Sequence, residues 1–220
     1  MTMNTPSPRP SRDELIASLA EEMSPVSPVQ PAQGGLLIGL ATAIVAVASI
    51  AGFGFWFGMI EGEASGFFWI VNGLLLLVGT ASALGVVASA LPRVGARGDA
   101  PFWAAAMLGV IPLAAIIMLF SSEHEGAHGH ELFYWPCAVS ALAAALVVGA
   151  AAVVFLRRGA PVSIERSGWL TGFAAGALGS VAYGITCPID DLAHVGLVHI
   201  VPVAVSAVIG RLAVPPLIRW

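Results

Sequence analysis

Two cysteines are the most reactive side chains in this 220-residue chain, and both adjoin apolar runs. Cys137 lies about one turn inside one run, and Cys187 closes the next run, directly before Pro188. If these runs are adjacent antiparallel helices, the two thiols lie at similar depth. A disulfide needs Cα atoms within roughly 4.4–6.8 Å, which this arrangement permits but does not require. Two buried thiols without a chemical role are the alternative, since free cysteine is among the most buried residue types.

A histidine-rich segment, S-S-E-H-E-G-A-H-G-H-E at 121–131, is the second candidate for chemistry. Imidazoles and carboxylates at this density suit zinc, copper or nickel, and histidine also titrates near neutral pH, so acid sensing is open too. His194 lies in a later loop beside Cys187 and could join either site. A solvated polar loop is the alternative. The candidate metal ligands are His124, His128, His130 and His194.

The interiors of the apolar runs carry almost no ionisable side chains. His199 is the exception, with Asn72 a weaker polar candidate. A histidine inside a membrane span is a functional candidate by default, but we expect this one to be packed and bonded to a backbone carbonyl. The apolar interiors argue against ion-coupled transport. No serine-hydrolase, phosphate-loop or zinc-protease motif occurs, so we do not expect an enzyme.

Six apolar runs position these residues, and each is close to the ~20 residues that cross a bilayer. The chain is 58% hydrophobic and 10% charged, whereas about a quarter of the residues in a soluble domain are charged. We therefore predict an all-α integral membrane protein with six transmembrane helices. The predicted spans are Leu36–Phe57, Phe67–Leu91, Phe102–Phe120, Phe133–Leu156, Trp169–Thr186 and Val195–Val214.

Arginine placement sets the predicted orientation, because the chain has no lysine. Every arginine falls in the N-terminal segment, at the C-terminal end, or in the loops after the second and fourth spans. The other loops carry acids and no arginine. By the positive-inside rule, both termini lie in the cytoplasm, as expected for a bacterial inner-membrane protein. The net charge of -4 and the lack of a basic patch argue against binding nucleic acid.

The fifth run carries Gly168, Gly172 and Gly176 in two overlapping G-x-x-x-G steps. Such steps let a neighbouring helix approach closely. We expect the fourth and fifth runs to pack as antiparallel neighbours. A homodimer through the glycine face is left open.

Residues 1–34 are predicted to form a cytoplasmic tail, and residues 35–220 the transmembrane domain. The tail holds a short amphipathic helix over Ser11–Met23, which opens with a capping box of Ser11 and Glu14. Prolines then favour an extended tether up to the membrane. These prolines are Pro25, Pro28 and Pro31.

The tail helix has an apolar stripe and an acidic polar face. A helix that lies on a membrane usually carries Lys and Arg on its polar face, so docking in a protein groove is the better hypothesis. A frayed tail is the alternative. The candidate docking residues are Leu15, Ile16, Leu19 and Met23, with the first-turn acids Asp13 and Glu14.

These features together resemble the NrsF-type (negative regulator of sigma F) integral-membrane anti-sigma factors. The matching features are the tail D-E-L-I-A-S-L-A-E-E-M-S-P-V-S-P, six short-looped spans, Cys137 after an aromatic-proline step, C-P-I-D-D at Cys187–Asp191, and the final Arg219-Trp220. The resemblance covers the chain beyond Met1–Arg12. It does not extend to the histidine-rich loop, nor to His194 and His199.

The resemblance implies a regulator that holds an extracytoplasmic-function (ECF) sigma factor at the inner membrane and releases it under stress. The two family cysteines linked to that response map onto Cys137 and Cys187. We therefore predict an anti-sigma factor that binds the sigma factor through the tail helix and senses oxidative or metal stress through these thiols. No cofactor is required, although a divalent or transition metal could bind the outer loop. The alternative is a small metal-ion transporter or a membrane metal sensor that uses the histidine-rich loop.

Overall fold

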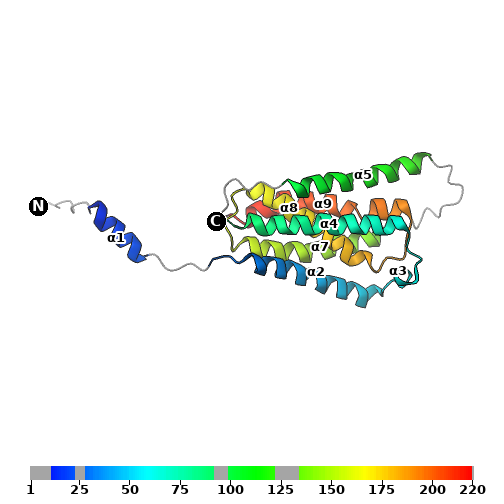
Figure 1. Cartoon of the computed structure of the whole chain (residues 1–220), viewed down its shortest axis with the longest axis horizontal. Helices are drawn as coiled ribbons and strands as arrows, with labels where there is room; N and C mark the ends of the chain where they lie inside the picture. The colour runs from blue at the N-terminus through cyan, green and yellow to red at the C-terminus, as the bar shows by residue number, and fades with distance from the viewer. Residues whose placement is uncertain (1–10, 23–27, 92–98, 122–133, 220) are drawn as a thin grey trace, which may run out of the picture.

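The structure is a computed structural model that describes residues 11–22, 28–91, 99–121 and 134–219, and these residues form helices and no strand. The long helices run side by side along one axis, with the N-terminal end of α2 and the C-terminus at the same end of the bundle (Figure 1). The elements are α1 (Arg12–Glu22), α2 (Pro31–Phe53), α3 (Gly58–Glu61), α4 (Gly66–Ser89), α5 (Ala100–Ser121), α7 (Trp135–Leu156), α8 (Ile164–Gly184), η1 (His194–Val198) and α9 (Val201–Leu217).

The all-α class is confirmed, but the prediction of six spans is not. Among the described residues, five helical segments are long and apolar enough to cross a membrane: α2, α4, Ala100–Ile117 of α5, α7, and His194–Leu217. The range Trp169–Thr186 falls almost wholly within α8, which does not meet this criterion. Glycine, serine and threonine occupy many of its positions. The physical reason is that most of α8 is buried against α9, α7 and α4, so its side chains face protein.

The predicted capping box at the start of the tail helix is confirmed. The backbone N–H of Ser11 donates to Oε2 of Glu14 (2.7 Å), and the backbone N–H of Glu14 donates to Oγ of Ser11 (3.3 Å). These bonds hold the pKa of Glu14 below its usual value, so the carboxylate form stabilises the helix start. None of the residues of α1 is buried, and Figure 1 shows the helix apart from the bundle. The predicted stripe residue Met23 lies outside the described residues.

The predicted proline tether ends earlier than expected. Pro31 is the first residue of α2, where its fixed φ suits a helix start and its missing N–H is not needed. Of the other two tether prolines, Pro25 lies outside the described residues.

Close helix packing at the centre of the bundle depends on the glycines of α8. A β-carbon added at Gly168 would lie 2.6 Å from the carbonyl oxygen of Gly210, and one at Gly176 would lie 2.6 Å from Cα of Val203. Both neighbours belong to α9. At Gly172 the added atom would overlap the carbonyl oxygen of Ser206 on the same helix. The glycine face is therefore covered by α9 of the same chain, so it is not open to a second copy, and a homodimer through another surface stays a prediction.

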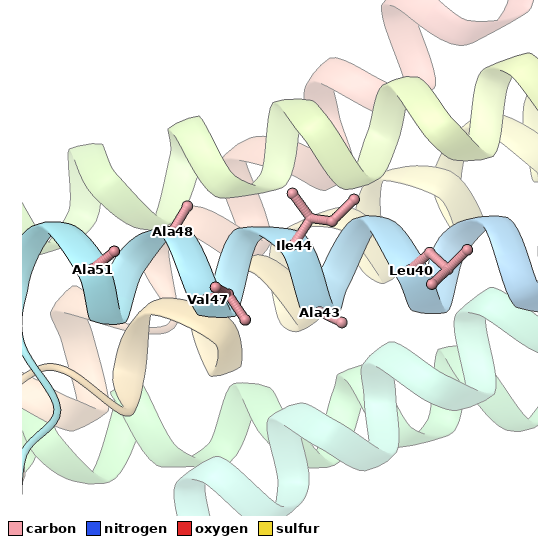
Figure 2. A pocket seen from close by; sticks show the side chains of 6 residues that line it. All are labelled: Leu40, Ala43, Ile44, Val47, Ala48 and Ala51. Atoms are coloured by element: carbon pink, nitrogen blue, oxygen red, sulfur yellow. The ribbon is translucent and has the colours of Figure 1, made fainter.

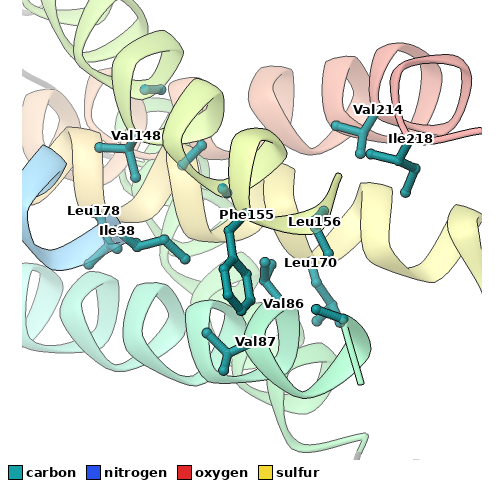
Figure 3. Close-up of a cluster of buried hydrophobic side chains, with 14 residues drawn as sticks. Ile38, Val86, Val87, Val148, Phe155, Leu156, Leu170, Leu178, Val214 and Ile218 are labelled. Carbon is teal, nitrogen blue, oxygen red and sulfur yellow. The ribbon is translucent and has the colours of Figure 1, made fainter. Parts of the chain in front are cut away.

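The predicted contact between the fourth and fifth runs is confirmed, because α7 packs against α8. Here a β-carbon added at Gly179 would lie 2.7 Å from the backbone nitrogen of Ala145. A buried apolar cluster fills the bundle near the C-terminal ends of α7 and α9 (Figure 3). At its centre, the ring of Phe155 occupies the space beside Gly34.

The outer face of α2 is apolar and uncovered. A shallow groove follows this helix (Figure 2), and it is lined by Leu40, Ala43, Ile44, Val47, Ala48 and Ala51. Unpaired apolar faces of this kind fit lipid acyl chains, as expected for a protein that lies in a bilayer.

We expect Gly172→Ala to destabilise the bundle by about 1–3 kcal/mol, because the new methyl group would force α8 away from the backbone of α9. The measurement is thermal unfolding of the purified protein in detergent, followed by near-UV circular dichroism. The control is Gly39→Ala on α2, where nothing lies within 4 Å of the added atom. Equal stability of the two variants would contradict the proposed close contact.

Candidate functional site

Four residues with metal-binding or redox-active side chains converge at the end of the bundle opposite the C-terminus. Cys137 lies in the first turn of α7, and Cys187 follows the end of α8. His194 begins η1, and His199 lies between η1 and α9. All four are buried, and their ligand atoms lie within 4.8 Å of one another. Cys187, His194 and His199 are near one another in the sequence, whereas Cys137 lies 50 residues before Cys187, so packing of the bundle brings Cys137 to the other three.

The two thiols are in direct contact. Both cysteines are free, with Sγ of Cys137 3.6 Å from Sγ of Cys187. The hydroxyl of Tyr183 donates to Sγ of Cys137 at 3.4 Å, and Nε2 of His194 lies 3.5 Å from Sγ of Cys187. In one of its tautomers, Nε2 of His194 can accept a hydrogen bond from the thiol of Cys187. A cysteine binds metals and reacts with oxidants as the thiolate.

A local change of helix type brings the two histidines to the same site. In an α-helix, residues five apart point about 140° away from each other. Residues 194–198 instead form a π-helical turn, in which hydrogen bonds run from residue i to i+5, so His194 and His199 lie on the same side. Their ring centroids are 5.4 Å apart. Pro202 follows as one of the first residues of α9, and its lack of an N–H suits the break in the helix at this point.

The loop between Cys187 and His194 is held in place by two neighbouring aspartates. Oδ1 of Asp191 accepts hydrogen bonds from the backbone N–H groups of Ala193 (2.8 Å) and His194 (3.2 Å). The carboxylate of Asp190 accepts from the backbone N–H of Ser65 and from its hydroxyl, the latter at 2.8 Å. Ser65 is the N-cap residue of α4, so the loop is fixed to a neighbouring helix. These bonds set the position of Cys187 and His194 relative to Cys137.

The expectation that His199 is packed is confirmed, but the expected bond to a backbone carbonyl is wrong. Its side chain is 2% exposed, yet neither ring nitrogen has a hydrogen-bond partner among the described residues, so no backbone carbonyl binds it. Its neighbours are instead the imidazole of His194, the ring of Tyr183 and the thiol cluster. The sequence singled out His199 as the one ionisable group inside an apolar run. No sequence pattern groups it with the cysteines, because only the π-helical turn makes it face them.

The remaining predicted metal ligands do not enter this site. His124, His128 and His130 lie outside the described residues, so a metal site in their loop stays a prediction. The sequence allowed His194 to join either the histidine-rich loop or the cysteines, and in the structure it lies beside the thiol of Cys187.

The second candidate site is the exposed face of α1. Leu15, Ile16 and Leu19 are 48%, 54% and 54% exposed, although they are large apolar residues. The carboxylates of Asp13 and Glu14 lie in the first turn of the same helix. An apolar stripe on a capped helix with no buried residue has the character of a docking surface for a protein partner.

These observations define a helical protein whose long apolar helices are consistent with a membrane protein, with a buried thiol and imidazole site and a separate exposed helix near its N-terminus. The chain belongs to the family of negative regulators of sigma F, whose model matches residues 19–220. Membership makes it a regulatory protein of the anti-sigma-factor type, with a sigma factor as its partner. Comparisons with curated proteins and with solved structures gave no match.

We expect Asp190→Ala to increase the rate at which a maleimide labels Cys187 by several-fold, because the loop would lose its two bonds to Ser65. Labelling is measured by mass spectrometry on the folded protein in detergent. The control is Asp99→Ala, which removes a carboxylate bonded to Arg166 at the other end of the bundle. An unchanged rate in Asp190→Ala would mean that this anchor does not hold the loop.

Proposed function

We propose that this protein sequesters an ECF sigma factor at the cytoplasmic face of the bacterial inner membrane and releases it on oxidative or metal stress. The observation that carries the proposal is the exposed apolar stripe of α1, on a chain whose residues 19–220 match the family of negative regulators of sigma F. An unpartnered stripe of this kind gains free energy when a partner covers it.

The stripe and the acids of α1 suit different parts of a sigma factor's surface. Leu15, Ile16, Leu19 and Met23 would enter an apolar groove, in the way that amphipathic helices bind other proteins. Asp13 and Glu14 would face the basic surface that the sigma factor uses for DNA. A sigma factor held by this surface cannot use it to bind a promoter, which is the inhibition that we propose.

The orientation of the bundle supports a cytoplasmic position for α1. The described arginines beyond α1 lie at the end where α7 and α9 finish and α8 begins. These residues are Arg157, Arg158, Arg166, Arg211 and Arg219. The opposite end carries acids, among them Glu61, Glu63, Asp190 and Asp191. By the positive-inside rule, the arginine end faces the cytoplasm. We include α8 as a sixth span, because its neighbours cover it and it needs little hydropathy of its own.

The thiol pair is the proposed sensor, and it lies at the opposite, outer end. Oxidation would remove two protons and two electrons from Cys137 and Cys187 and join their Sγ atoms. A peroxide would accept both protons and both electrons: hydrogen peroxide would be reduced to two waters, and an organic hydroperoxide to an alcohol and one water. A disulfide has an S–S length of about 2.05 Å, so the two sulfurs, now 3.6 Å apart, would move closer. The start of α7 would then shift relative to the end of α8.

Continuous helices connect the sensor to the cytoplasmic end. α7 and α8 both run from the thiol site to the arginine end, and small helix shifts are a common form of switching. To move the sigma factor from mostly bound to mostly free, the two states must differ by about 5.5 kcal/mol in their affinity for it. A homodimer is not needed for this mechanism.

We expect the pair of changes Leu15→Glu and Leu19→Glu to weaken sigma-factor binding by at least about 100-fold, or about 2.8 kcal/mol, because both charges would enter an apolar interface. Binding is measured by co-purification of the candidate ECF sigma factor with the full-length protein in detergent, followed by titration.

The matched control is Ala17→Glu with Ser18→Glu, which adds the same charge to other faces of α1 and should bind normally. Capture that survives the Leu15 and Leu19 changes would remove α1 as the interface. If the native chain captures no sigma factor, metal transport becomes the leading function, and flux should then persist without residues 1–34.

We expect Cys137→Ser with Cys187→Ser to bind the sigma factor normally but to fail to release it on oxidation, because a serine pair cannot form a disulfide. Release is measured as induction of a sigma-dependent reporter after addition of peroxide. The control replaces His124, His128 and His130 with Ala and should respond as the native protein does. Normal peroxide induction in the double serine variant would refute the thiol sensor.

A further inference from the structure

The candidate site has the ligand set of a tetrahedral metal centre. We propose that Cys137, Cys187, His194 and His199 bind one Zn²⁺ ion, or a metal ion of similar coordination chemistry. This proposal deepens the sensor described above by naming its ligand. It stands on the geometry of the site and does not depend on whether α1 binds a sigma factor.

The distances between ligand atoms fit such an ion. Zinc binds thiolate sulfur at about 2.3 Å and imidazole nitrogen at about 2.0–2.1 Å, so neighbouring ligand atoms of a tetrahedral site lie about 3.3–3.8 Å apart. The two sulfurs here are 3.6 Å apart, and Sγ of Cys187 is 3.5 Å from Nε2 of His194. No pair of ligand atoms is more than 4.8 Å apart, so closing the site shortens the widest pair by at most about 1.5 Å.

His199 supplies an independent observation. A buried polar group without a hydrogen bond costs free energy, so nearly all such groups in proteins have a partner. Both ring nitrogens of His199 are buried and lack one among the described residues. A metal ion at the site would bind one of these nitrogens. The helix break between η1 and α9 also favours metal binding by His199, because it turns this imidazole toward the sulfurs.

The charge balance also favours a divalent ion. Binding would release the two thiol protons and leave two thiolates, whose charges neutralise those of Zn²⁺. A neutral centre suits this position, since the surrounding residues are apolar or small: Ala138, Ala141 and Val198 pack against the cysteines. The hydroxyl of Tyr183, which already contacts Sγ of Cys137, would remain as a hydrogen-bond donor to a ligand sulfur, as second-layer groups often do at metal sites.

Metal binding and disulfide formation would exclude each other, because both use the same two sulfurs. The metal would connect the start of α7 to the loop after α8 through bonds of about 2 Å, and oxidation would expel it. The state of the sensor would therefore depend on metal supply as well as on oxidant. One site would then respond to both oxidative and metal stress, and the histidine-rich loop would not be needed for either response.

The test uses the full-length protein in detergent, reduced with a phosphine, and Co²⁺ as the probe. We expect one equivalent of Co²⁺ to give the intense visible absorption of a tetrahedral site together with a sulfur-to-cobalt charge-transfer band. Added Zn²⁺ should abolish both bands. A native protein that remains folded and monodisperse but gives neither band would overturn the proposal.

Variants separate the buried centre from the histidine-rich loop. His199→Phe keeps a buried ring and should weaken Co²⁺ binding by at least 100-fold, and Cys187→Ser should remove the charge-transfer contribution of that sulfur. The control, in which His124, His128 and His130 are changed to Ala, should bind as the native chain does. Thermal unfolding reports whether each variant is folded. Loss of binding in the loop variant, with native binding in folded His199→Phe, would place the metal in the loop and refute this centre.

Discussion

The contact between α8 and its neighbours is the constraint on which the rest of the structure depends. Glycines remove the side chains that would otherwise separate α8 from the backbone of α9 and α7. Van der Waals packing of this kind is a main source of helix association in lipid. There the hydrophobic effect does not drive helices together, because lipid tails are as apolar as the side chains. Because Cys137 lies in the first turn of α7, Cys187 follows the end of α8 and His199 precedes α9, the same contacts determine where the four site residues meet.

The site joins rigid and irregular backbone. Cys137 is carried by a regular helix, whereas the other three residues lie on a loop, a π-helical turn and a helix break. Irregular backbone at membrane depth is tolerated where protein buries it, as it is here. The anchor between Asp190 and Ser65 and the bonds to Asp191 then restrict the loop. The irregular backbone allows small displacements at the thiols, while α7, α8 and α9 keep their packing against one another.

The sequence predicted those features that depend on local pattern. Apolar runs located the long helices, the Ser11–Glu14 pair located the start of α1, and G-x-x-x-G spacing located a close helix contact. Predictions from the sequence were wrong or incomplete for features that depend on tertiary packing. The run Trp169–Thr186 was predicted as a span like the other five, although the glycine, serine and threonine residues of α8 leave it below the hydropathy that those five segments reach. Which helix covers the glycine face of α8, and where His199 points, depend on tertiary packing and on a π-helical turn that no sequence pattern revealed.

The composition of α8 also bears on how the protein is made. As the proposed sixth span, α8 gains little from transfer into lipid by itself, since glycine, serine and threonine dominate much of its length. Its insertion therefore depends on its neighbours: α7 precedes it during synthesis, but α9, which covers the glycine face, is made after it. Between these two events the glycine face of α8 lacks the helix that covers it in the folded protein. The thiol and imidazole site can therefore form only after α9 has packed against α8, because His199 directly precedes α9.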